Sequence, residues 1–141
     1  MRHTFNENKW MWFDYENGDQ QELRELVSNN PEYENWFENI KDRNTNLLEL
    51  DTQIRGEEYI WGSLIYQQDI QDKNEKNIFH FWISRDFFVL VDFDLSVLKA
   101  NPVAIHKQMN QAENAVDGFF IILGEVLVSY LQKIDGYEER L

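Results

Sequence analysis

Two carboxylates late in the chain have a spacing that could do chemistry. Asp92 and Asp94 lie two residues apart at the end of the apolar run FFVLV, so in an extended strand both side chains would point to one face. Carboxylates paired in this way can hold a cation or share acid–base work, as in a small hydrolase. We favour the simpler interpretation, a strand end that is solvated by its own acids before a turn.

The histidines form no metal or catalytic motif. His3, His80 and His106 lack the i, i+4 spacing with an intervening glutamate that a helical zinc site uses. His80 lies between Phe79 and Phe81, which favours a hydrogen-bonded core histidine over a metal ligand. The chain also has no cysteine, no Gly-x-Ser-x-Gly elbow and no glycine-rich phosphate loop. We therefore predict that the protein is not an enzyme.

The composition indicates one acidic, folded domain. The 141 residues are 43% hydrophobic and 15% aromatic, and their formal net charge is −13. This length and apolar content suit a single domain with a substantial core. The lack of clustered Lys and Arg argues against a nucleic-acid partner, whereas an acidic surface suits cations. The N-terminus has no apolar run of the signal-peptide type, so we expect an intracellular location.

Apolar periodicity predicts a layered domain over residues 1–113. The predicted strands cover 9–15, 47–54, 58–68, 78–84 and 87–94, and the predicted helices cover 19–27, 31–42 and a segment starting near 102. The strands from 58 to 94 are apolar on both faces, so helices should cover both sides of the sheet. In 47–54, leucines alternate with acids, which predicts a half-exposed strand. The order of elements predicts an α/β fold, an α/β/α layered domain with a mixed central sheet.

Residues 114–141 are predicted to form one long amphipathic helix that packs on this domain and leads towards a missing stalk. Apolar residues alternate steps of four and three along a seam that suits helix–helix packing. The seam consists of Val116, Phe120, Leu123, Leu127, Tyr130, Ile134, Tyr137 and Leu141. A second set widens the apolar stripe in the first half and consists of Phe119, Ile122, Val126 and Leu131. The apolar part is too short, and too charged at Glu125, to span a bilayer.

Two features of this helix carry further expectations. Gly118, Gly124 and Gly136 would each weaken a helix interior, so we expect a neighbouring backbone to approach closely at these positions. No helix-stop signal follows Leu141, so we expect the chain to be a fragment of a longer protein.

Three stretches resemble the cytoplasmic N-terminal domain of the CorA family of magnesium transporters. They are EEYIWGSLIYQQ, IFHFWISRDFFVLVDFD and NAVDGFFIILGEVLVSYLQKIDGYEERL. The resemblance extends over about Tyr33–Leu141 and rests on the order and spacing of the strands and helices and on the residue types within them. It implies a funnel-shaped homo-pentamer on the cytoplasmic face of the membrane, whose domains sense Mg²⁺ between subunits and close the pore. The family's Gly-Met-Asn signature and its membrane helices are absent from this sequence, so membrane attachment would come from C-terminal segments that it lacks.

The resemblance also implies a candidate metal ligand. In the family, an acid at the end of the helix before the strand run pairs with an acid on a neighbouring subunit's stalk. The corresponding pair here is Glu38 and Asn39, with Asn39 where the direct ligand would be expected. Glu38 is therefore the candidate Mg²⁺ ligand, and the alternative is a solvated residue on the polar face of its helix.

A function of another class stays open beside the sensor. The chain would then be a free-standing acidic interaction module that binds a partner helix through the exposed seam of the last two turns of its final helix.

Overall fold

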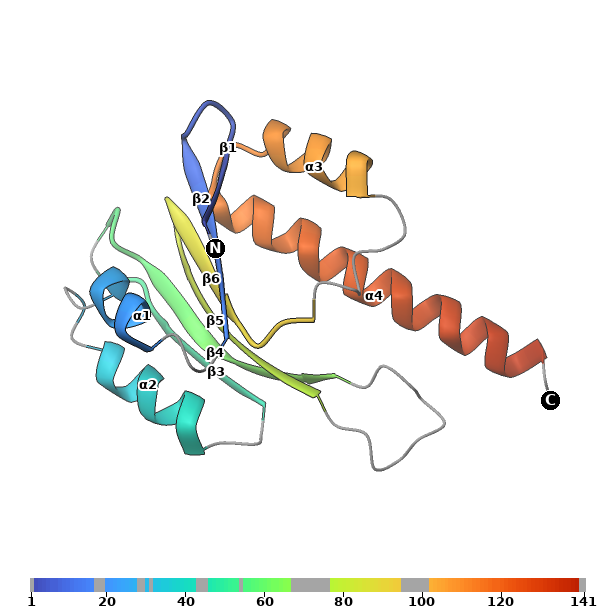
Figure 1. The fold of residues 1–141 in the computed structure, drawn as a ribbon, viewed down its shortest axis with the longest axis horizontal. Helices are drawn as coiled ribbons and strands as arrows, with labels where there is room; N and C mark the ends of the chain where they lie inside the picture. Colours follow the sequence, from blue (N-terminus) through green and yellow to red (C-terminus); the bar gives the residue numbers. More distant parts are fainter. Residues whose placement is uncertain are drawn as a thin grey trace.

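A computed structural model describes most of the chain. The described residues are 2–16, 20–27, 30, 32–42, 46–53, 55–66, 77–94 and 102–139. The structure places two helices on one side of a sheet and two on the other (Figure 1). This arrangement confirms the predicted α/β/α fold.

Six strands among the described residues form one mixed sheet. They are β1 (Arg2–Phe5), β2 (Trp10–Tyr15), β3 (Leu47–Asp51), β4 (Tyr59–Tyr66), β5 (Asn77–Ser84) and β6 (Phe87–Val91). Their order across the sheet is β1-β2-β6-β5-β4-β3. The β2–β6 pair is parallel, and the other neighbouring pairs are antiparallel.

The helices form two layers. Helices α1 (Gln20–Val27) and α2 (Tyr33–Asp42) cover one face of the sheet, and α3 (Pro102–Gln111) and α4 (Ala115–Glu139) cover the other (Figure 1). The side chains of β6 alternate between the two layers. Phe88 and Leu90 pack towards α4, Val89 and Val91 pack towards α1 and α2, and all four have 0% exposure. The prediction of strands buried on both faces is therefore confirmed.

The first strand, β1, was not predicted. It pairs with β2 through a tight turn in which Asn6, Glu7 and Asn8 have φ values of 52°, 56° and 65°. Asparagine adopts this left-handed conformation more readily than most residues. The segment RHTF buries only Phe5, so its sequence carries almost no apolar alternation by which a strand could be recognised.

The edge strand β3 exposes its leucines. Leu48 and Leu50 are 62% and 58% exposed, whereas Leu47 packs against the α1–α2 layer. Leu48 and Leu50 face the same side as α4, but α4 packs mainly on β2, β5 and β6. The side of β3 that carries Leu48 and Leu50 is therefore exposed to solvent, because α4 does not extend over this edge of the sheet.

Helix α4 packs on the sheet through the second set of predicted apolar residues, whereas the predicted seam is buried only in part. Phe119, Ile122 and Val126 are 5%, 1% and 6% exposed and contact the sheet. In the predicted seam, by contrast, Phe120 and Leu127 are 61% and 57% exposed. The amphipathic character of α4 stays a prediction, because apolar residues also lie on its open side. Its C-terminal half extends past the sheet (Figure 1).

The close approach expected at the helix glycines occurs at Gly118, but the neighbour is a side chain. A Cβ atom there would lie 2.3 Å from Cη2 of Trp10, whose own side chain is fully buried. The Trp10 indole Nε1 donates a hydrogen bond to the Ala112 carbonyl at 2.9 Å, which ties β2 to the α3–α4 connection. At Gly124 no described atom lies within 4 Å of such a Cβ, so the expectation is wrong there. The surroundings of Gly136 lie outside the described side chains.

No helix within the described ranges combines the length and the apolar character that a bilayer crossing requires.

Neighbouring phenylalanines on α4 provide a matched test of this packing. We expect Phe119→Ala to lower the free energy of unfolding by about 3–5 kcal/mol, because it leaves a cavity beneath the helix. Phe120→Ala should change it by less than about 0.5 kcal/mol, because that ring faces solvent. Urea denaturation of the two variants measures both values. Equal losses would contradict the orientation of α4.

Candidate functional site

The position of α2 on the sheet determines where the candidate site lies. The Asn30 side chain accepts a hydrogen bond from the Glu32 backbone N–H at 2.9 Å and so caps the start of this helix. The apolar face of α2 then seats Trp36, Phe37 and Ile40 on the sheet with 0%, 2% and 5% exposure. This anchoring turns the helix so that Glu38 faces the edge of the sheet.

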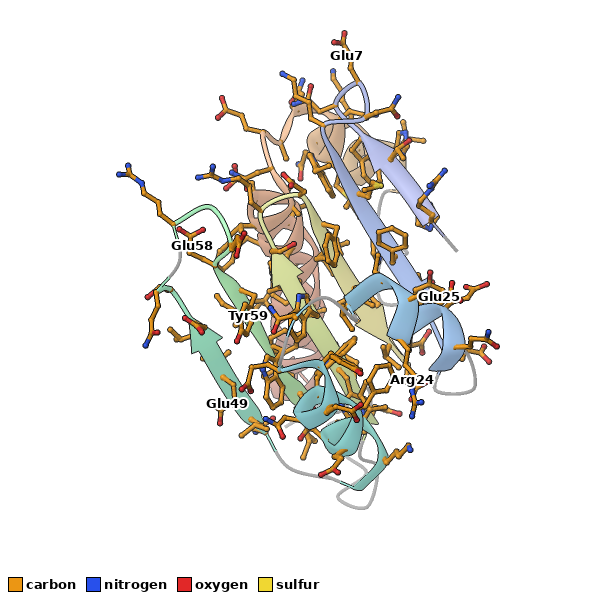
Figure 2. All side chains as sticks on the ribbon, turned by 90° about the vertical axis from the view of Figure 1, so that its left-hand side faces the viewer. Glu7, Arg24, Glu25, Glu49, Glu58 and Tyr59 are labelled. Atoms are coloured by element: carbon orange, nitrogen blue, oxygen red, sulfur yellow. The ribbon has the colours of Figure 1, made fainter. Side chains whose placement is uncertain are left out.

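An acidic cavity of about 470 Å³ lies between α2 and that edge. Its lining consists of Glu32, Asn35, Glu38 and Asn39 from α2, Leu47 and Glu49 from β3, and Trp61 from β4. Glu49 projects from the strand that runs along this edge (Figure 2). The predicted ligand Glu38 is thus exposed and lines a cavity that is also lined by Glu32 and Glu49.

A buried polar chain lies under the cavity. Asn39 Nδ2 donates a hydrogen bond to Ser63 Oγ at 2.5 Å, and Ser63 Oγ lies 2.6 Å from Nδ1 of His80. The three residues are 3%, 0% and 2% exposed, and Ser63 and His80 face each other across β4 and β5. Burial lowers the pKa of His80, and the Asp92 carboxylate opposes this shift. His80 is therefore the hydrogen-bonded core histidine that its sequence context indicated.

Two polar atoms at the cavity are buried without a hydrogen-bond partner. They are Oδ1 of Asn39, the end of the amide that does not bond to Ser63, and Nε1 of Trp61. A buried polar group that lacks a partner costs about 1–3 kcal/mol.

The carboxylates suit a hydrated cation better than a bare one. Within the described residues, no three His, Asp or Glu side chains come close enough together to hold a metal ion directly. One cavity acid, Glu32, already accepts a hydrogen bond from Asn35 at 3.1 Å. Mg²⁺ usually keeps several waters and binds through only one or two carboxylates. Glu38 and Glu49 could hold such an ion through its water shell.

The pairing expected of Asp92 and Asp94 depended on an extended strand through both residues. Strand β6 instead ends at Val91, and Asp92 has a φ of 62°. The Asp92 backbone N–H donates to the Tyr15 carbonyl at 2.9 Å, which holds this turn against the end of β2. The expectation that strand alternation places both carboxylates on one face is therefore wrong. The hydrolase interpretation loses the geometry on which it rested.

Sequence reasoning did not single out Glu49, Trp61 or Ser63 as site residues. Ser63 carried a usable signal, because it is a polar residue inside the apolar run YIWGSLIY and a buried hydroxyl needs a partner. Glu49 and Trp61 carried no comparable signal, because an acid on an exposed strand and an aromatic residue in a core strand are both ordinary.

Comparison with known proteins bears on the identity of this fold. The chain is 34% identical over 135 residues to the Magnesium transport protein CorA of Bacillus subtilis. The resemblance to CorA is confirmed. The similar region makes up 94% of this chain but only 42% of the CorA protein, so the chain spans less than half the length of that relative. No family model and no solved structure matches the chain.

The lowered pKa of His80 predicts a pH-dependent contribution to stability. An unfolded histidine has a pKa near 6.5, so the unfolded chain takes up this proton first as pH falls. The stability that neutral His80 provides is full above the unfolded pKa and is lost as pH falls through the folded pKa. We expect the difference in unfolding free energy between the wild type and His80→Gln to shrink from about pH 7.5 to about pH 5. A difference that stays constant over this range would contradict the shift.

Proposed function

We propose that this chain is the cation-sensing regulatory domain of a CorA-family divalent metal ion transporter, with Mg²⁺ as the sensed ion. The observation that carries the proposal is the 34% identity to CorA of Bacillus subtilis over 94% of this chain. A transporter domain also fits the absence of a catalytic motif from the sequence.

The acidic cavity supplies the chemistry of the proposed sensor. The chain carries a net charge of −13, and three carboxylates line this cavity. A hydrated divalent cation held by Glu38 and Glu49 would reduce the repulsion between α2 and β3. An ion that binds one arrangement of an assembly more tightly than another shifts the equilibrium between them, which is the physical basis of sensing.

The proposal includes the setting of the domain. The full-length protein would be a homo-pentamer, and this chain would lie on the cytoplasmic face of the membrane below a pore formed by other segments. A neighbouring subunit would then supply a further acid to the ion. Asn39 gives this chain a neutral oxygen where the family carries the direct acidic ligand, so ion binding here would depend more on Glu38 and on outer-sphere contacts.

Magnesium should stabilise the 141-residue chain. At a free Mg²⁺ concentration about ten times the Kd, binding to the folded state alone adds about 1.4 kcal/mol to the unfolding free energy. We expect thermal denaturation to show this gain for the wild type and to show most of it lost in Glu38→Gln. NaCl at the same ionic strength as the magnesium salt controls for screening.

Glu7→Gln is the matched control variant. It removes the same charge from an exposed position in the β1–β2 turn, far from Glu49 (Figure 2). The Mg²⁺ response of Glu7→Gln should equal that of the wild type. If Glu38→Gln and Glu7→Gln respond alike, the site at Glu38 is wrong. If the wild type does not respond at all, the sensing function is lost for this chain.

A second candidate function, the acidic interaction module, is favoured by the open side of α4. Phe120, Leu127 and Val128 are 61%, 57% and 43% exposed. Their spacing fits a partner helix, and the acidity of the chain favours basic residues flanking that helix's apolar stripe.

A synthetic amphipathic peptide with Leu on one face and Lys beside it tests this candidate. We expect the double variant Phe120→Ser/Leu127→Ser to bind the peptide at least about tenfold more weakly, because it removes most of the exposed apolar area. Its melting temperature should stay unchanged. Val103→Ser, which alters a side chain 78% exposed on α3, should bind normally. Equal binding by all three proteins would rule out the seam as the contact surface.

A further inference from the structure

Strand β3 forms one edge of the sheet. It is the last strand in the order across the sheet, and among the described residues its neighbour is β4 alone. Every second residue of an edge strand directs its backbone N–H and C=O groups away from the sheet, where another chain can bond to them. Glu49 projects from β3 along this edge (Figure 2). The edge therefore offers a row of backbone groups to an extended chain.

The two faces of β3 differ in their chemistry. Leu48 and Leu50 lie on the α4 side, because Leu50 pairs with Ile60, which packs against the core beneath α4. These leucines are 62% and 58% exposed. Glu49 lies on the opposite side, where Glu38 lines the same cavity. A chain that added to β3 would thus meet leucines on one face and carboxylates on the other.

We propose that β3 binds an extended segment of a partner protein in which basic and apolar residues alternate, and that this segment adds to the sheet as a further strand. Successive side chains of an extended chain point to opposite faces, so the two kinds of residue are sorted automatically. The apolar residues cover Leu48 and Leu50, and the basic residues enter the acidic cavity. Strand addition of this kind takes affinity from backbone bonds and specificity from side chains. The inference does not depend on cation sensing.

The cavity has the space and the charge for the basic side chains. Its volume is about 470 Å³, and it lies between α2 and the edge to which the segment would add. Glu32, Glu38 and Glu49 line it, and none of its described lining residues is Lys or Arg. The chain as a whole carries a net charge of −13. Charge complementarity therefore favours a basic partner.

The pattern of β3 differs from that of an edge which is merely protected. Charged residues on edge strands often serve only to prevent aggregation. That role would account for Glu49, but it gives no reason for the exposed leucines on the other face. A second copy of β3 is also a poor occupant. An antiparallel pair centred on Glu49 would place two like charges opposite each other, which is destabilising.

Backbone methylation of a synthetic peptide provides the decisive test. The probe is the end-blocked peptide Lys-Val-Lys-Val-Lys-Val-Lys, and calorimetry measures its affinity for the 141-residue chain. One version carries N-methyl groups on the lysines, and another carries them on the valines. Only alternate residues of an added strand face β3, so one version should bind at least about tenfold more weakly than the other. Equal affinities would mean attraction by charge alone and would overturn strand addition.

The order of residues in the peptide is the second test. Lys-Val-Val-Lys-Lys-Val-Lys has the same composition and charge, but its valines suit one face of a helix. We expect it to bind at least about tenfold more weakly than the alternating peptide, because it cannot send all its valines to one face of a strand. Equal binding of the two peptides would overturn the proposed extended conformation.

Variants of the chain locate the contact. Glu49→Gln and Leu50→Thr change one face of β3 each and leave its backbone in place. Each should weaken the alternating peptide about tenfold, whereas Glu7→Gln should bind it like the wild type. Circular dichroism checks that the variants are folded. If Glu49→Gln binds as tightly as Glu7→Gln, the assignment to β3 is wrong. If the wild type self-associates in light scattering and Leu50→Thr is monomeric, a second copy occupies the edge, and the choice of partner is overturned.

Discussion

The burial of β5 and β6 on both faces is the constraint on which the rest of this structure depends. Helical layers cover both sides of these strands, so the side chains in the middle of both strands are buried. Apolar residues meet this condition simply by packing. A polar residue in the same position must find a partner inside the protein, because an unpaired buried group costs about as much as several ordinary contacts contribute. His80 is such a residue, and its partner is Ser63 on the adjacent strand.

The sheet is covered less completely towards its β3 edge, and the candidate site lies at this edge. Strand β3 is covered on its α2 side only in part, and its other side exposes Leu48 and Leu50. Helix α2 spans the boundary, with Trp36 in the core and Glu38 at the cavity. Asn39 lies between these two environments, because it lines the cavity and its amide nitrogen donates a hydrogen bond to Ser63 in the core. A helix anchored by aromatic residues can hold such an intermediate residue in a fixed place.

The resemblance to CorA bears on the residue at position 39. Over the similar region the chain has the layered fold and the acidic cavity, but at the position where the family is expected to carry a direct acidic ligand it has an asparagine. A carboxylate brings a charge that attracts the ion from a distance. A carbonyl oxygen brings only a short-range dipole, which is effective when its direction is fixed.

The sequence by itself determined the layered α/β/α architecture, because apolar residues at both strand parities require cover on both faces and the strand–helix order leaves few topologies. It also identified His80 as a core histidine from its immediate neighbours, whereas Glu38 was suggested only by the resemblance to the CorA family. Tertiary structure alone decided the rest. The strand β1 has almost no apolar pattern of its own. Leu48 and Leu50 are exposed because α4 does not extend over them, and Phe120 is exposed because it lies on the side of α4 that faces away from the sheet. The chain from Asn39 through Ser63 to His80 joins residues 24 and then 17 positions apart, so it depends on how α2, β4 and β5 pack. Local periodicity reports which face a residue occupies, but not which distant residue lies opposite it.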